Sequence, residues 1–575
     1  MFLQQEFNLA NCLEILNEIW KNDRWFDFKA FEKTACYCES VMKKIGLAEV
    51  EKLPLKADGK TVYGDWQMPQ AWDASSATLT IEETGKVIAD YLQTPTSLVM
   101  YSAPTARGGV RANVVDTDVV YATEDGTTVT ADDNPDAWVK QAKAQVAELN
   151  NDVMDIILLT NKSAGTVVSL ARELGAVGII SDFIPLYKDV RDNPFDLQGH
   201  SRWDNNFCVP KNETGLFAFD LSPENGKLLR EMLENGKVVL HATVDTTFRD
   251  GVNYVVSGAI LGETDEEVIS YGHLYEPGAL DNASGCAVLL SLAECMARGI
   301  NEGKLPKPKR TLRFVVGWEC VGSTAWLITH KQRQRKTVAG IVADMVGTEA
   351  IDNTFLRIWH NPMANYGFVD ALIKQLIPVH KKNVGVDYPV IHREFGIATD
   401  NIMCDPFWGI PTISFITEPA LSYHSSLDTP GRIDRDILRR CAVLIGTFMW
   451  ECAQMNDDKK RLLADIAMDD LKELNPALHR ELQNPTPPTG KKVPQRVTAG
   501  CLNLANRPDL ADAKWQMSWN TKLHLPLFWT DGERDIEQIT KLAAADTGRD
   551  DLDEYRKEII EMFDFLAKNG YLEYK

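Results

Sequence analysis

The chain has few of the sequence features that indicate disulfide cross-links, export or membrane anchoring. Its 575 residues include eleven cysteines, an odd number without regular spacing, which favours free thiols over a disulfide framework. Residues 1–6 contain no basic segment followed by a long apolar run, so no signal peptide is expected. No stretch approaches the roughly 18 apolar residues that a membrane span needs. These absences predict a cytoplasmic protein without a membrane partner.

Positive charge is also scarce relative to negative charge. The chain has 61 lysines and arginines against 82 aspartates and glutamates, which is a net charge of −21. Such an excess argues against nucleic acid as the main partner, because phosphates would be repelled. The apolar content of 44% and the charged content of 25% are ordinary for a globular protein, and the length predicts more than one domain.

Hydrophobic patterning separates three regions in the first four fifths of the chain. Residues 1–95 begin with helical spacing up to about residue 60 and are assigned to the N-terminal part of the domain that continues at 246–465. Residues 96–245 carry short strand patterns, the first at 97–101, and form a β-rich insert. Residues 246–465 alternate strand and helix patterns. This alternation predicts an α/β fold with a mostly parallel sheet covered by helices on both faces.

A separate small domain is predicted near the C-terminus. Residues 483–494 are rich in proline and indicate an extended linker. Residues 497–575 contain two amphipathic helix patterns and a terminal hairpin strand, an order that resembles a winged helix. This region has ten lysines and arginines against fifteen aspartates and glutamates, so its net charge of −5 repels DNA. We therefore interpret it as a packing or oligomerisation module.

The most informative motif follows the strand pattern at 266–271. It reads Tyr271-Gly-His273-Leu-Tyr275-Glu276-Pro-Gly278-Ala-Leu-Asp281-Asn-Ala-Ser-Gly285 and runs into an alanine- and leucine-rich helix pattern. A histidine and an aspartate are thus expected at the carboxyl end of a strand, where open α/β sheets bind ligands.

Three later strand patterns end in matching groups. The pattern at 310–318 is followed by Glu319 and Cys320, the pattern at 338–343 by Asp344, and the pattern at 410–416 by a loop with His424. Imidazoles and carboxylates gathered from strand ends suit zinc or a similar divalent ion. Beside such an ion, Glu319 is the right group to take a proton from water.

The order of these motifs resembles the co-catalytic zinc exopeptidases of clan MH, which are leucyl-aminopeptidase-like enzymes. The segment Gly278 to Gly285 is the most specific part of the resemblance, which spans roughly residues 10 to 450. Residues 165–182 and 219–258 resemble a protease-associated domain that runs into the catalytic sheet. The resemblance is greatest to a branch with a C-terminal winged helix.

The resemblance implies one or two zinc ions with a defined ligand set. His273 and Asp344 would hold one metal, Cys320 and His424 would lie around the other, and Asp281 would bridge them. Glu319 would be the general base.

Two positions depart from the family's pattern. The family's second glutamate, a metal ligand, is Cys320 here, and this cysteine is either a thiolate ligand or a small buried hydrophobic residue. Without that carboxylate, a single-metal enzyme is an alternative. The aspartate that often orients the first histidine is Tyr275 here, so Glu276 or a backbone carbonyl would have to replace it.

Several neighbouring residues allow two interpretations. Trp318 and Tyr423 flank the expected site and are either substrate contacts or packing residues. Asp428 precedes Thr429-Pro430 and is expected to form a turn. His392 and Asp400 lie in a stretch whose polarity either lines the substrate pocket or reflects an ordinary loop.

The predicted function is that of a cytoplasmic metal-dependent exopeptidase, an aminopeptidase acting on short peptides or aminoacyl conjugates. One alternative is acyl transfer or cyclisation on the same scaffold, and another is a catalytically weak binding or assembly protein, which Cys320 and the acidic C-terminal region motivate. The resemblance also allows a homo-oligomer.

Overall fold

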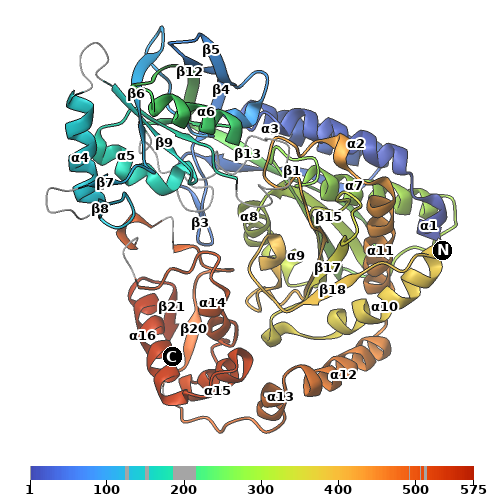
Figure 1. The fold of residues 1–575 in the computed structure, drawn as a ribbon. Helices are drawn as coiled ribbons and strands as arrows, with labels where there is room; N and C mark the ends of the chain where they lie inside the picture. Colours follow the sequence, from blue (N-terminus) through green and yellow to red (C-terminus); the bar gives the residue numbers. More distant parts are fainter. Residues whose placement is uncertain are drawn as a thin grey trace.

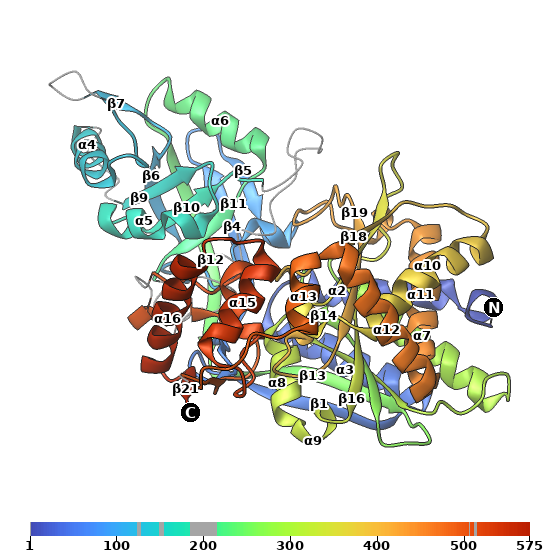
Figure 2. The same cartoon turned by 90° about the horizontal axis from the view of Figure 1, so that it is seen from below.

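A computed structural model describes residues 2–122, 128–148, 155–184, 215–490, 492–504, 507–510 and 514–575. The chain builds two large sheets, each with its own helices, and a C-terminal helical unit packed beside both (Figures 1 and 2).

The larger sheet has eight strands and a parallel centre. The central strands β15, β14, β16 and β19 run parallel, whereas β1, β13 and β17 pair antiparallel with their inner neighbours. Four of its seven pairings are parallel, so the sheet is mixed with a parallel centre. Its spatial order is β1 (Ala48–Ala57), β13 (Gly251–Ile260), β15 (Thr311–Trp318), β14 (Glu267–Leu274), β16 (Thr337–Ala343), β19 (Thr412–Glu418), β17 (Phe355–Trp359) and β18 (Val390–Arg393).

Burial explains why the central strands form. Every residue of β14 and β15 is buried, as expected for parallel strands covered on both faces. Figure 1 shows α8 on one side of β15 and α7 with α11 on the other. The helices of this unit are α1 (Phe2–Glu6), α2 (Leu9–Asp23), α3 (Phe28–Ile45), α7 (Ala283–Asn301), α8 (Val321–Thr329), α9 (Lys331–Gln334), α10 (Phe368–Val384) and α11 (Arg435–Gln454).

Two expectations about this unit need correction. Strand β1 occupies Ala48–Ala57, where helix was expected; its residues are mostly half-buried or exposed, as suits the edge of a sheet. Helix α7 is long and apolar enough to cross a membrane by length and composition, contrary to the expectation from the sequence. However, 78% of its apolar window is buried inside the structure, where α7 packs against α2, α11 and β14. Its hydrophobicity is therefore that of a core helix.

The second sheet has seven strands and lies beside the first. Its order is β11 (Phe217–Asp220), β10 (Gly178–Ser181), β9 (Asp155–Thr160), β6 (Val110–Asp116), β12 (Val239–Arg249), β4 (Ala71–Ile81) and β5 (Lys86–Asp90). Strands β4 and β5 precede residue 96, and β12 leads directly into β13 of the larger sheet. Its helices are α4 (Pro135–Glu148), α5 (Val168–Leu174) and α6 (Pro223–Leu233).

The strand expected at 97–101 is absent from this described segment. The chain forms a short 3₁₀ turn, Pro95–Ser97, and Leu98 makes only an isolated bridge to Phe219. The segment Leu98 to Tyr101 is nevertheless at most 2% exposed. A buried irregular segment produces the same apolar run as a strand, which is why the pattern misled.

The C-terminal unit is helical with one small sheet. The terminal strand β21 (Leu572–Tyr574) pairs with β20 (Pro494–Arg496), at the end of the expected linker, and not with the adjacent arm of a hairpin. The Arg496 guanidinium reaches the unit of the eight-stranded sheet, where it donates two hydrogen bonds to Asp405, at 2.6 and 2.8 Å. The helices are α12 (Asp457–Leu474), α13 (Pro476–Gln483), α14 (Thr521–Phe528), α15 (Ile536–Thr547) and α16 (Leu552–Lys568).

Candidate metal centre

The predicted ligands come together at the carboxyl ends of the central parallel strands. His273 is the penultimate residue of β14, and Asp281 lies just before α7. Asp344 follows β16, and His424 lies in the loop after β19. These side chains, together with Glu276, form a group that we call the edge cluster: His273, Glu276, Asp281, Asp344 and His424.

Asp281 lies between the two histidines. Its Oδ1 is 3.4 Å from His273 Nε2, and its Oδ2 is 3.0 Å from His424 Nε2. Asp344 Oδ1 lies 3.2 Å from the same nitrogen of His273. One carboxylate oxygen thus faces each imidazole, which is the position that a bridging ligand requires.

The distances fit a small tetrahedral cation. Zinc holds nitrogen and oxygen ligands at about 2.0–2.2 Å, so neighbouring tetrahedral ligands lie about 3.4 Å apart. The separations of 3.2 and 3.4 Å around His273 agree with this spacing. His273, Asp281 and Asp344 are 1–5% exposed, so the donor set gathers carboxylates away from water, where their charge calls for a cation.

Glu276 was not predicted as a ligand, yet it belongs to the cluster. The ligand atoms of His273, Glu276 and Asp281 lie within 4.8 Å of one another, the one such group among the described residues. Glu276 Oε2 is also 4.0 Å from His424 Nε2. The sequence did offer a signal, because Glu276 is the carboxylate nearest to the position of the missing orienting aspartate.

Electrostatics within the cluster favour a charged His273. Burial alone lowers the pKa of His273, but the Asp344, Glu319 and Asp281 carboxylates outweigh it and raise that pKa well above the usual value. Burial acts to raise the pKa of Asp281, yet the hydrogen bond from His424 and the charge of His273 bring it below its usual value. The site thus holds positive charge strongly, as a cation-binding site must.

Glu319 lies directly after β15, beside the cluster. It is 8% exposed, and burial raises its pKa to about 8, with His273 opposing the shift and Asp400 and Asp344 adding to it. Asp400 Oδ1 accepts hydrogen bonds from the Cys320 backbone, at 2.8 Å, and from the Ser323 hydroxyl, at 2.6 Å. Asp400 therefore holds the turn that follows Glu319, a role that its loop position did not reveal.

Cys320 occupies the first position before α8, with φ of 56°. It is fully buried, and burial raises the pKa of its thiol well above the usual value, with the Glu319 and Asp400 carboxylates adding to the shift.

The loop before α7 is shaped by Asp428 and by glycine. Asp428 closes a local turn, as predicted, because its N–H donates to the Ser425 carbonyl at 3.0 Å. Its buried carboxylate also accepts hydrogen bonds from the backbone of Leu280, at 2.7 Å, and of Asp281, at 3.1 Å, so it orders the ligand loop as well. A Cβ on Gly278 would lie 2.2 Å from Asp428 Oδ2. The Asp281–Asn282 peptide is cis.

Asn282 joins this loop to the end of β16. Its side-chain NH₂ donates to the Ala343 carbonyl at 3.0 Å. Its side-chain oxygen accepts from the Gly285 backbone N–H at 3.0 Å, and this hydrogen bond caps the start of α7. A Cβ on Gly285 would lie 2.1 Å from the Ala343 carbonyl oxygen, so only glycine fits this close approach.

The two aromatic residues expected near the substrate differ in position. Trp318 is 1% exposed and packs against Phe28, Phe31 and Tyr275, which favours the second of its two interpretations, that of a packing residue. Tyr423 is half-buried, and its ring stacks on His424 with centroids 3.7 Å apart. His392 lies away from the cluster, hydrogen-bonded to His360 beyond the far end of β17.

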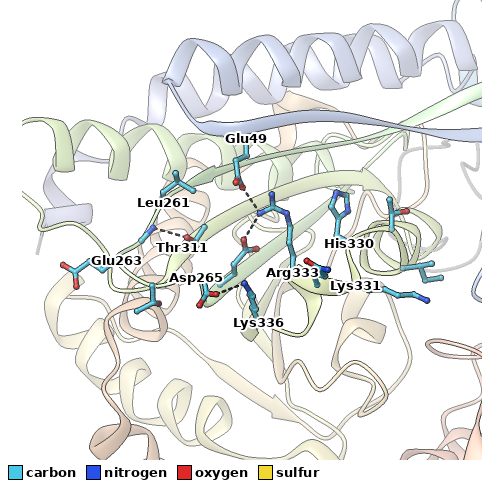
Figure 3. A pocket seen from close by; sticks show the side chains of 15 residues that line it. Glu49, Leu261, Glu263, Asp265, Thr311, His330, Lys331, Arg333 and Lys336 are labelled. Carbon is cyan, nitrogen blue, oxygen red and sulfur yellow. Dashed lines mark hydrogen bonds and ion pairs between the residues drawn. The ribbon is translucent and has the colours of Figure 1, made fainter.

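A separate cavity of about 890 Å³ lies at the opposite, amino end of the same sheet (Figure 3). It is lined by the start of β14 and β15 and by α9, including Glu267, Thr311 and Arg333. Its charged groups are joined to one another, as in the ion pair of 2.6 Å between Lys336 and Asp265. It therefore has no part in the edge cluster.

Comparisons with known proteins agree with this geometry. Residues 237–449, which include the whole edge cluster, match the family described as Peptidase family M28. No curated protein matches the chain.

Solved structures share the fold at low sequence identity. A putative peptidase from Clostridium acetobutylicum is 16% identical over 100% of both chains, with a TM-score of 0.50. A Peptidase M28 precursor from Shewanella amazonensis SB2B is 18% identical, with a TM-score of 0.53, over 79% of this chain and 96% of its own. A zinc aminopeptidase from Bacillus subtilis is 17% identical, with a TM-score of 0.52, over 79% and 97%. These likenesses establish an M28-type fold.

Proposed function

We propose that this chain is a metal-dependent aminopeptidase that uses zinc to hydrolyse short peptides or aminoacyl conjugates in the cytoplasm. The observation that carries the proposal is the edge cluster, in which two histidines and three carboxylates converge beside the buried Glu319. The family match over 237–449 and the zinc aminopeptidase with the same fold support it. The ten described cysteines are free thiols, which supports a reducing compartment.

The donor set suits zinc, with His273, Asp281, Asp344 and His424 as ligands. When bound, zinc polarises the scissile carbonyl and brings the pKa of water close to neutrality. Glu319 accepts the proton of the attacking water on its carboxylate and delivers it to the leaving amine. Burial, which raises the pKa of Glu319, suits a group that must hold this proton between the two steps. Asp400 keeps the following turn, and hence Glu319, in place.

The test is Glu319→Gln in the zinc-loaded protein. We expect hydrolysis of aminoacyl p-nitroanilides and dipeptides to fall about 10²- to 10⁴-fold, because a positioned general base contributes about that much. Zinc content and thermal midpoint should stay at the wild-type values. Glu263→Gln is the matched control, because Glu263 is exposed at the opposite end of the sheet.

Four results would overturn the proposal. Undiminished hydrolysis by Glu319→Gln would remove Glu319 from the reaction. Cleavage of N-acetylated substrates as fast as free amines would exclude an aminopeptidase. Products that have lost water or ammonia by mass spectrometry would indicate a cyclase, and the absence of any turnover together with a stable complex by light scattering would indicate a binding protein.

A further inference from the structure

The chain turns sharply between the first histidine of the cluster and Glu276. Tyr275 has φ of 73°, a left-handed conformation that is costly for a bulky residue and is held by its contacts. Its backbone N–H donates to Asp23 Oδ2 at 2.9 Å, and its hydroxyl donates to the Tyr254 carbonyl at 2.6 Å. Its ring packs on Phe31, with centroids 4.9 Å apart. Tyr275 is thereby held in the core.

This turn leaves His273 without its expected orienting partner. His273 Nδ1 is buried and has no hydrogen-bond partner among the described residues, whereas Nε2 faces two carboxylates. Tyr275, which stands where an orienting aspartate is expected, therefore does not orient His273. It anchors the loop from which Glu276 projects.

Glu276 projects toward the half of the cluster that contains His424. Its Oε2 is 4.0 Å from His424 Nε2, and its carboxyl group hydrogen-bonds Asp281. Asp281 in turn is 3.0 Å from the same nitrogen of His424. Two carboxylates and one imidazole thus surround a point on the His424 side of Asp281, and Glu276 also has a ligand atom within 4.8 Å of one of His273. The separations of 3.0 and 4.0 Å bracket the roughly 3.4 Å between tetrahedral zinc ligands.

Cys320 is engaged elsewhere. Its backbone donates to Asp400, and its side chain is fully buried at the start of α8. The described group with ligand atoms within 4.8 Å of one another contains Glu276 and not Cys320.

We infer that Glu276 supplies the carboxylate of a second metal position, together with Asp281 and His424, in place of the residue that follows Glu319. The loss of a carboxylate at Cys320 is thus offset by a residue from a different loop, 44 positions earlier in the chain. Cys320 packs as a small buried side chain. This inference deepens the proposed function and rests on it only for the presence of a metal centre.

The test compares zinc stoichiometry in three full-length proteins. Apo protein is titrated with Zn²⁺ alone by calorimetry, and bound metal is counted by elemental mass spectrometry. Wild type should bind two ions per chain, Glu276→Gln one, and Cys320→Ala two. The Gln side chain keeps the size of Glu276 but not its charge, and the zinc that remains at His273 and Asp344 would show that the variant is folded.

Cobalt provides a second readout that does not depend on activity. Co²⁺ bound to a thiolate has an intense near-ultraviolet charge-transfer band that oxygen and nitrogen ligands do not produce. We expect wild type loaded with two Co²⁺ ions to lack this band, and Cys320→Ala to have the wild-type visible spectrum. Glu276→Gln should lose about half of the visible absorption at saturation, because one of its two sites is gone.

The inference is overturned if Cys320→Ala drops to one ion while Glu276→Gln keeps two, if the thiolate band appears, or if wild type binds a single ion that neither variant affects. These outcomes are separate from failure of the proposed function. A protein with the expected metal counts but no aminopeptidase activity would retain the Glu276 site and lose the enzymatic proposal.

Discussion

The buried carboxylates at the two ends of the eight-stranded sheet have different interaction partners. At the amino end, Glu267 is 5% exposed and accepts two hydrogen bonds from Arg313, at 2.7 and 2.8 Å, while Arg333 lies 3.0 Å away. At the carboxyl end, the ion pairs that Asp281 and Asp344 form within the described part of the chain are with histidines.

The difference separates a structural ion network from a ligand set. Guanidinium groups neutralise Glu267 permanently, because an arginine stays charged at any physiological pH. Imidazoles are weaker cations that can release their protons and coordinate a metal instead. A buried carboxylate is thus permanently neutralised by arginines at one end of the sheet. At the other end, a carboxylate paired with histidine can bind a metal instead.

Removal of the central carboxylate should have the largest effect on this contrast. In Asp281→Asn, both histidines lose the oxygen that faces them, so neither metal position remains complete. We expect zinc affinity to fall by more than about 100-fold, because even changes outside the ligand shell cost about 10–100-fold. Calorimetric titration with Zn²⁺ measures this, and Glu263→Gln again serves as the control. Unchanged affinity would show that Asp281 is not the shared ligand.

Breaking the network at the other end should cost stability and leave the metal alone. In Arg313→Met, the buried Glu267 keeps only Arg333 as a close cation, so we expect a loss of about 3–5 kcal/mol in the free energy of unfolding. The zinc count should not change. The control Lys336→Met removes a cation whose partner Asp265 is 75% exposed, and it should cost less than about 1 kcal/mol. Denaturant midpoints check both, and an equal effect of the two variants would contradict the contrast.

A pH series tests a buried carboxylate that has only neutral donors. Asp23 accepts hydrogen bonds from Thr34 and from the Tyr275 backbone, and burial raises its pKa from 3.8 to about 7. Because the folded pKa lies above the unfolded one, the stability that Asp23 contributes is complete below about pH 4 and is lost as the pH rises toward 7.

Asp23→Asn should remove this dependence, since an amide occupies the same space without titrating. We expect the difference between the thermal midpoints of variant and wild type to increase in favour of the variant from pH 5 to pH 7, and to stay constant above pH 7. Over these two pH units, one titrating group changes the free energy of unfolding by at most about 2.7 kcal/mol, which is less than the loss expected for Arg313→Met. A constant difference between the two proteins across this range would contradict a raised pKa at Asp23.

Much of the eight-stranded sheet could be predicted because its central strands are uniformly apolar. The four strands that end at the site were predicted with boundaries that differ by at most three residues from β14, β15, β16 and β19. Buried parallel strands read as continuous hydrophobic runs, which are easy to find. The protease-associated character of the insert and the winged-helix character of the C-terminal unit stay predictions.

Other elements could not be predicted because the sequence does not record what covers them. Strand β1 is a half-exposed edge with charged residues, so its composition resembles that of a surface helix. Trp318 stands next to Glu319 in the sequence, but alternation along β15 directs it into the core against Phe31. Proximity in the chain therefore suggested a substrate contact that the packing does not support.

By itself, the sequence determined which residue types stand at the ends of the central strands, and therefore where imidazoles and carboxylates would meet. Strand periodicity and a few polar residues after each strand are local properties, and they can be read without the fold. Only the tertiary structure decided between Glu276 and Cys320, because that choice depends on the direction of two turns. Contacts from distant elements set those turns, with Asp23 holding Tyr275 and Asp400 holding Cys320.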